Sequence, residues 1–445
     1  MKFLRSVISV ILAVSLLCTF GCGDDAEKDQ DKKEIPMESP NFLFTEDMVL
    51  YMISYTEMMY ADEMNAAGVE SSQPLSGQMR TEDESWGDYI YKKTLENMEY
   101  MILYCEAAYK DDYTVSEGML YKATESVSYF STAAKDMGKT VEEYIAELYG
   151  ENVTLEGLET CTQMLALCEG YEIFLQDSAE IDKDMINEYA EKNENDFLKF
   201  DALRFTTKNK VFAEELAAAE SKKDFLAILG KVSGIDLTDS DKNGITDIFE
   251  VNDAAVSSDI AGEAALEEGR ETEDTVIIEK DEKYIVTMFL SLPKKDITPV
   301  YDYRLIYIST ESSTDPYADA SSLRDQWIKK NGGEEGFADL AARYSDDPTA
   351  YYGGRTVETK DAMPNDSVRT WVTHESRKEG DTTRLPGGEE GAYIIYFIDG
   401  NIPLWEYEAI NALRQKYSTE HVESLKDEIK KTIKSNEKLI RELVK

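Results

Sequence analysis

Apolar residues recur every three or four positions through the first part of the chain, from Thr45 to about Ala190. One such run consists of Met48, Tyr51, Met52, Tyr55 and Met59. This spacing places one apolar stripe along an α-helix, because the helix has 3.6 residues per turn. It predicts an all-helical domain over residues 41–196, with a loop rich in Gly, Ser and Pro at residues 66–83.

Three threonines mark expected helix starts. Thr114 and Thr140 are each followed three positions later by a glutamate, which is the capping-box pattern, and Thr154 is a candidate N-cap. In a capping box the threonine hydroxyl and the glutamate carboxylate each accept a hydrogen bond from a free backbone N–H. Three helices should therefore begin near these residues.

After residue 196 the pattern changes to alternating strands and helices, and it occurs twice. Strands are predicted at residues 197–205 and 284–289, and again at 301–308 and 393–397. A helical segment at 224–229 matches one at 336–341, and Gly269 and Gly380 precede the two closing strands. These matches predict an internal duplication of an α+β unit, with domains at residues 197–294 and 299–401.

Helical periodicity returns after Pro403. The apolar face comprises Val422, Leu425, Ile429, Ile433, Ile440 and Leu443. An amphipathic helix needs a surface on which to bury that face. We therefore expect residues 402–445 to form C-terminal helices that pack on the helical domain.

The chain starts with Lys2 and Arg5, followed by an apolar stretch at residues 7–20. This stretch is shorter than the roughly 20 residues that span a bilayer, and it predicts a cleaved signal peptide at residues 1–21. Cys22 follows Gly21 at the position where lipoprotein signals are cut, so it is the candidate lipidation site; an ordinary cleaved signal is the alternative. Residues 22–40 are polar and predict a disordered tether. The protein would then be extracytoplasmic, held by lipid on the outer face of a bacterial plasma membrane.

Acidic residues outnumber basic ones by 90 to 47, which gives a formal net charge of −43. Nucleic acid is excluded as a partner, because binding to its phosphates needs a basic surface. An anionic membrane would also repel this body, so the lipid at Cys22 would have to provide the attachment.

Beyond the signal region the chain has three cysteines, Cys105, Cys161 and Cys168. The last two are seven residues apart on a predicted helix, about 10 Å, which is beyond the reach of a disulfide. We expect buried free thiols and no structural bridge. No cluster of cysteines and histidines has the spacing of a zinc site, and no organic cofactor is indicated.

Residues 337–350 read Phe-Ala-Asp-Leu-Ala-Ala-Arg-Tyr-Ser-Asp-Asp-Pro-Thr-Ala, and they are followed by Gly353-Gly354 and by Gly391-Ala-Tyr-Ile-Ile395. This pattern resembles the parvulin (PpiC-type) peptidyl-prolyl isomerases, and the whole chain resembles the SurA/PrsA group of extracytoplasmic foldases. The resemblance implies an α+β protein: a SurA-N-like helical chaperone domain, two parvulin-like domains in tandem and a long C-terminal helix. It implies a foldase or chaperone that binds unfolded or nascent secreted polypeptides.

The resemblance also assigns site residues in the second copy. Asp347 occupies the position of the catalytic Cys or Asp, while Met363 and Val368 fall where the family has its proline-pocket residues. Leu305 and Tyr393 stand where the family has its two histidines. The peptide-binding set is therefore Leu305, Met363 and Val368, and the catalytic set is Asp347 and Tyr393.

Because both family histidines are absent, we expect peptide binding to persist without efficient isomerisation. An active peptidyl-prolyl isomerase that uses Asp347 and Tyr393 is the alternative. The chain's only histidines, His374 and His421, are expected on the surface. In the first copy, Arg204 and Tyr284 are expected near the site positions, so that copy should be catalytically silent. A third and weaker alternative is a solute-binding lipoprotein, but the chain lacks the alternating βαβ run of such proteins.

A separate motif lies inside the first copy, at residues 239–250. Its spacing is that of an EF-hand-type calcium loop, with a glycine, Gly244, at position 6. The expected calcium ligands are Asp239, Asp241, Asn243, Ile245 through its carbonyl, Asp247 and Glu250. An empty acidic turn is the alternative, since the whole protein is acidic.

Overall fold

The computed structural model describes residues 34–444 except 71, 231–247, 331 and 389. The chain is α+β and forms two compact units. The described part of the first unit comprises residues 34–179, 301–400 and 414–444, and the second comprises residues 180–300 and 401–413. Among the described residues, no helix has both the length and the apolar character required to cross a membrane.

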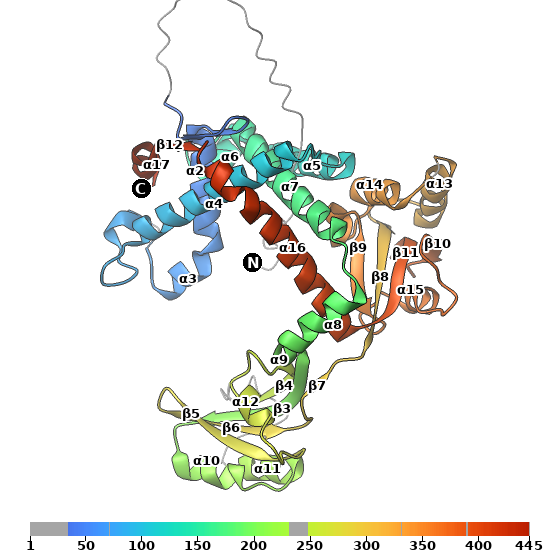
Figure 1. Cartoon of the computed structure of the whole chain (residues 1–445). Coiled ribbons are helices and arrows are strands. Elements are labelled where there is room, and N and C mark those ends of the chain that lie inside the picture. Colours follow the sequence, from blue (N-terminus) through green and yellow to red (C-terminus); the bar gives the residue numbers. More distant parts are fainter. Residues whose placement is uncertain (1–33, 71, 231–247, 331, 389, 445) are drawn as a thin grey trace, which may run out of the picture. The chain divides into compact units, whose positions relative to one another are not determined.

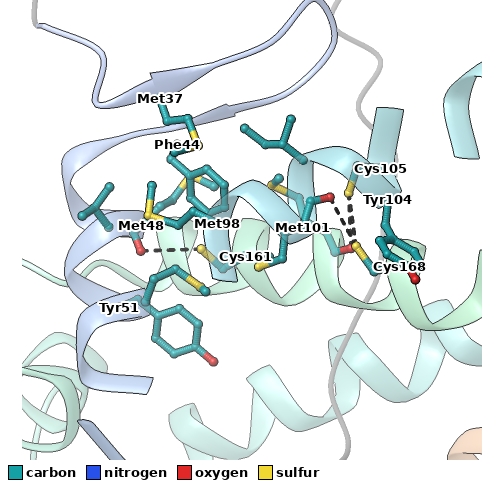
Figure 2. Packing of buried hydrophobic residues seen from close by; sticks show 14 of the residues in the cluster. Met37, Phe44, Met48, Tyr51, Met98, Met101, Tyr104, Cys105, Cys161 and Cys168 are labelled. Atoms are coloured by element: carbon teal, nitrogen blue, oxygen red, sulfur yellow. Dashed lines mark hydrogen bonds between the residues drawn. The ribbon is translucent and has the colours of Figure 1, made fainter. Parts of the chain in front are cut away.

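The first unit contains the helical part of the chain (Figure 1). The helices of this helical part are α2 (Glu46–Met59), α3 (Ala61–Ala66), η1 (Leu75–Gly77), α4 (Trp86–Lys110), α5 (Glu117–Asp136), α6 (Val141–Tyr149) and α7 (Leu155–Ser178). Helices α2, α4 and α7 share one apolar core, in which Trp86 and Tyr171 are almost completely buried. Figure 2 shows the methionine- and cysteine-rich part of this core.

Two of the three predicted helix starts are confirmed. Thr140 forms a complete capping box with Glu143 at the start of α6, and Thr154 caps α7. The prediction for Thr114 was wrong. The cap of α5 is Ser116, whose hydroxyl accepts the N–H of Met119, because it is Ser116 that directly precedes the first helical residue.

The two ends of the described chain meet in the first unit. Strands β1 (Met37–Glu38), β2 (Leu43–Phe44) and β12 (Lys434–Ser435) form one small sheet in the order β12-β1-β2. From α16 (Leu404–Lys430) and α17 (Glu437–Leu443), the side chains of Val422, Ile429 and Ile440 enter the core of the helical part. In the structure, the C-terminal helices therefore contact the helical part through residues 422–444.

The beginning of α16 belongs to the second unit instead. Its Ala409 is buried in a cluster with Ile186, Ala190 and Phe197. These three lie on α8 (Lys183–Lys192) and α9 (Glu194–Phe197), which also belong to the second unit. The compact helical part thus ends at residue 179, earlier than the expected boundary at 196.

The second unit contains one α+β sheet, which we call the first repeat. Its elements are β3 (Leu198–Thr207), α10 (Lys210–Ala217), α11 (Lys222–Leu229), β4 (Ile248–Ala255), α12 (Gly262–Ala265), β5 (Thr275–Lys280), β6 (Lys283–Phe289) and β7 (Lys294–Lys295). The strand order is β4-β3-β6-β5, with β7 paired to β3. Helices α10 and α11 cover one face of the sheet and α12 the other (Figure 1).

The second repeat belongs to the first unit. Its elements are β8 (Pro299–Ser309), α13 (Pro316–Lys329), α14 (Glu334–Tyr344), η2 (Pro348–Tyr352), β9 (Arg355–Thr359), α15 (Asp366–Val372), β10 (Thr382–Pro386) and β11 (Gly391–Pro403). The strand order is β10-β11-β8-β9. Helices α13 and α14 pack on one face through Trp327 and Phe337, and α15 packs on the other through Val368 and Val372.

The two repeats have the same topology. Among the described residues, each repeat has a strand, two α-helices, a strand, a short α-helix and two strands in this order, and the second repeat also has η2 before its second strand. When the four main strands of each repeat are numbered by their order in the sequence, their spatial order in the sheet is 3-4-1-2 in both repeats. Identical connectivity of this kind is what the duplicated sequence pattern predicted, and the opening and closing strands lie where the pattern placed them.

One turn is repeated in detail. Before the third strand of each repeat, an arginine pairs with an aspartate four residues later: Arg270 with Asp274 at 3.7 Å, and Arg377 with Asp381 at 3.6 Å. The backbone N–H of the residue before this aspartate bonds to the carbonyl of a phenylalanine on the closing strand. That residue has a positive φ in both copies, 73° at Glu273 and 83° at Gly380. The counterpart of Gly380 is therefore Glu273, and the predicted match with Gly269 was wrong.

Within the first unit, the second repeat packs on the helical part through α14 and α5. The N–H of Gly118 donates to the Asp339 carboxylate at 3.0 Å, and Arg343 pairs with Glu117 at 2.7 Å. A Cβ atom on Gly118 would lie 2.9 Å from the Cβ of Ala342. The absence of a side chain at Gly118 thus allows the two helices to approach closely.

Candidate functional site

The face of the second-repeat sheet that lies against α15 brings together the predicted peptide-binding residues. Leu305 on β8, Val368 on α15 and Met363 in the turn before α15 belong to one apolar cluster. All three are buried, with at most 4% of the residue exposed. Their side chains fill the space between the sheet and α15, so little of them is accessible to a bound peptide, and their role in peptide binding stays a prediction.

The accessible part of this face is aromatic. Tyr307 on β8 and Tyr393 on β11 stack with ring centroids 4.8 Å apart, and both are only partly buried. Trp371 and Leu385 lie partly exposed on the same cluster. The Tyr307 hydroxyl donates to the carbonyl of Glu390 at 2.8 Å, which fixes that ring. A bound chain would meet this aromatic surface, which we call the tyrosine face (Tyr307, Trp371, Leu385 and Tyr393).

The Ser-Asp-Asp segment fastens the end of α14 to β8. The Ser345 hydroxyl accepts the N–H of Tyr307 at 3.0 Å, and the N–H of Asp346 donates to the Tyr307 carbonyl at 2.8 Å. Asp347 then begins η2, where its carboxylate accepts both the N–H and the hydroxyl of Thr349. The predicted catalytic Asp347 thus caps a turn, and this cap holds its carboxylate in place.

Beside Asp347 lies a cluster of phenols and carboxylates. The hydroxyl of the fully buried Tyr303, on β8, donates to the carboxylate of Glu358 on β9. Burial raises the pKa of Glu358; the hydrogen bond from Tyr303 opposes this, and the charge of Asp347 adds to it. Burial, together with the neighbouring Tyr307 and Asp347, raises the pKa of Tyr393 to about 12. The charge of Asp347 thus contributes to the raised pKa of Tyr393, and the catalytic role of these two residues stays a prediction.

Tyr303 and Glu358 are site residues that were not predicted. Tyr303 could have been found, because it precedes Leu305 by two positions on a strand and so must lie on the same sheet face. No sequence signal identifies Glu358, which comes near only because β9 pairs with β8. Chemically, the cluster offers the Tyr393 hydroxyl, which stays protonated at neutral pH, and the carboxylates of Asp347 and Glu358 beside an apolar surface. The hydroxyls of Tyr303 and Tyr307 already donate to Glu358 and to the carbonyl of Glu390. The Tyr393 hydroxyl and the two carboxylates can hold a peptide amide through hydrogen bonds.

Neither histidine contributes to this cluster through its recorded contacts. His374 is exposed after α15, and its ring bonds to the hydroxyl of Ser376. His421 is on α16 and lies 2.7 Å from the carboxylate of Asp111.

The corresponding face of the first repeat is occupied by an ion pair. Arg204 on β3 pairs with Asp259 at 2.7 Å, and its Nε donates to the hydroxyl of Thr287. Tyr284 packs on the opposite face with α10 and α11, so Arg204 and Tyr284 do not form one site as predicted. On β6, Thr287 lies opposite Arg204, and Tyr284 is three residues from Thr287. An odd separation along a strand places two side chains on opposite faces of the sheet.

The proposed calcium loop and lipidation site fall mainly outside the described residues. Asp239, Asp241, Asn243, Ile245, Asp247 and Cys22 all lie there. Glu250, the last expected ligand, is on β4; its side chain is 60% exposed and pairs with Lys222 at 2.8 Å. No group of three or more His, Cys, Asp or Glu in the described part of the chain is arranged to hold a metal ion.

No protein-family model matches the chain, and no curated protein matches it significantly.

Proposed function

We propose that the protein is an extracytoplasmic folding factor of parvulin-like design that binds unfolded or nascent secreted polypeptides. The observation that carries this proposal is the tyrosine face, where stacked Tyr307 and Tyr393 lie beside the hydrogen-bonding cluster of Tyr303, Glu358 and Asp347. The common topology of the two repeats supports it further.

The chemistry of this face suits an unfolded chain. Aromatic rings bury large apolar area without demanding one side-chain shape, and hydroxyls and carboxylates can pair with the peptide groups that every sequence offers. Binding would then depend little on client sequence. The Cys22 lipid anchor would keep this activity at the membrane surface. The expectation that a disordered tether extends to residue 40 was wrong, because Met37 and Glu38 form strand β1 and the side chain of Met37 is fully buried in the core of the first unit.

The first test is suppression of aggregation of a chemically unfolded client, followed by light scattering. Equimolar protein should suppress scattering. The double substitution Tyr307→Ser and Tyr393→Ser should raise the concentration for half-suppression about fivefold, since about 1 kcal/mol of apolar contact would be lost.

A matched control replaces two exposed tyrosines on the helices of the opposite face, Tyr317→Ser and Tyr344→Ser. Suppression should be unchanged by that pair. Melting curves of both variants check that they are folded. If the wild-type protein leaves scattering unchanged at equimolar concentration, the folding-factor proposal fails.

The second candidate function is catalysis of X-Pro isomerisation, supported by the effect of the Asp347 charge on the pKa of Tyr393. In a proline-peptide assay, Asp347→Asn and Tyr393→Phe should each lower kcat/KM about tenfold or more, a loss of about 1.4 kcal/mol of transition-state stabilisation. Asparagine keeps an oxygen acceptor for the cap of η2, so the turn should persist. Tyr344→Phe is the control. A wild-type rate equal to the uncatalysed rate would exclude the enzyme and leave the binding function intact.

We also propose that residues 239–250 bind calcium, because four carboxylates within twelve residues repel one another without a cation. At 10 mM Ca²⁺, a site with a Kd of about 10⁻⁴ to 10⁻³ M adds about 1.4–2.7 kcal/mol of stability. Thermal unfolding should show this gain for the wild type and for the control Glu279→Ala, and Asp239→Ala should abolish it. If Ca²⁺ does not raise the thermal stability of the wild type, the proposal of a calcium site fails.

A further inference from the structure

The core of the helical part brings together two cysteines that are far apart in sequence. Cys105 on α4 and Cys168 on α7 have their Sγ atoms 3.6 Å apart (Figure 2). Each sulfur also lies 3.4 Å from a carbonyl of the other helix, Cys105 from Met164 and Cys168 from Met101. The two thiols therefore face each other where α4 and α7 cross.

The third cysteine is held elsewhere. Cys161 is on the same helix as Cys168, but its Sγ approaches the carbonyl of Met48 on α2 at 3.8 Å. Figure 2 shows it pointing toward α2, away from the pair. All three cysteines are buried free thiols in this structure, as expected. The expectation that no bridge forms rested on the spacing of Cys161 and Cys168, whereas the packing favours the pairing of Cys105 with Cys168.

We propose that Cys105 and Cys168 form a disulfide bond that joins α4 to α7 when the protein folds in an oxidising compartment. A disulfide oxidant, written R′SSR′, supplies the chemistry. One cysteine thiolate attacks it, forms a mixed disulfide and releases R′SH; the second cysteine then displaces the other R′SH. Overall two thiols lose two protons and two electrons, and the oxidant is reduced to two thiols.

Burial sets the timing of this reaction. The pKa of Cys105 lies well above its ordinary value, because the thiol is buried and Cys168 is beside it. The reactive thiolate is therefore scarce once the core has closed, and an oxidant cannot reach the sulfurs. The bond should form while α4 and α7 are assembling, and it should then resist reduction.

The test uses the full chain with Cys18→Ser and Cys22→Ser, so that only three thiols remain. The protein is unfolded in urea and refolded with a mixture of oxidised and reduced glutathione, then alkylated, digested and analysed by mass spectrometry. A peptide pair joined through Cys105 and Cys168 should predominate, with Cys161 alkylated. The oxidised protein should melt about 5 °C or more above the reduced protein.

Three single variants complete the design. Cys105→Ala and Cys168→Ala should each abolish the cross-link and the rise in melting temperature, and Cys161→Ala should keep both. Circular dichroism verifies that each variant is folded. The proposal is overturned by three alkylated thiols in the refolded wild type, by a bond that includes Cys161, or by an oxidised protein that melts no higher than the reduced one.

Discussion

Replacing Gly354 by alanine should destabilise the first unit by about 3 kcal/mol or more. This glycine precedes β9 with φ of 71°, a conformation that costs other residues about 1–2 kcal/mol. An added Cβ would also lie 2.1 Å from the carbonyl oxygen of Leu305. Relieving that overlap would separate β9 from β8 and break the hydrogen bond from the Leu305 N–H to the Gly354 carbonyl.

The measurement is urea unfolding monitored by circular dichroism. Gly388→Ala is the matched control, because Gly388 has φ of 77° but no atom within 4 Å of its Cβ position. It should cost only the conformational part, about 1–2 kcal/mol. Equal losses in the two variants would show that the contact between β8 and β9 does not depend on the missing side chain. Because β9 carries Glu358, Gly354→Ala should also weaken client binding.

Replacing Arg355 by methionine should destabilise the first unit by about 3 kcal/mol. Arg355 makes two contacts to the buried Asp302, at 3.2 and 2.8 Å, and one to Asp177 of α7 at 2.7 Å. Burial lowers the pKa of Arg355, but its hydrogen bonds and the charges of both aspartates outweigh this and raise it. Methionine would leave Asp302, only 6% exposed, without its charged partner.

Arg369→Met is the control, because Arg369 pairs with Asp366 at the surface, where the two side chains are 37% and 91% exposed. An exposed pair contributes about 0–1 kcal/mol. Adding Asp302→Asn to Arg355→Met should recover at least half of the lost stability, since the isolated charge is removed. A loss for Arg355→Met no larger than that of Arg369→Met would contradict the role of this ion pair.

The resemblance identified residues from separate stretches that share one face of the second repeat, but it did not predict how deeply they are buried or which further residues join them. Asp347 caps a local turn, in which its N–H donates to the hydroxyl of Ser345 and its carboxylate accepts the N–H of Thr349. Leu305, Met363 and Val368 do meet, but their depth below the surface depends on how closely α15 packs on the sheet.

The sequence alone determined the helical character of residues 45–190, the opening and closing strands of both repeats and two of three helix caps, because periodicity and capping are properties of neighbouring residues. Only the tertiary structure decided that Glu358 reaches Tyr303, that Arg204 and Tyr284 face apart, and that Cys105 meets Cys168. These depend on strand pairing and helix crossing, in which packing of the whole core selects one arrangement among many that the local pattern permits.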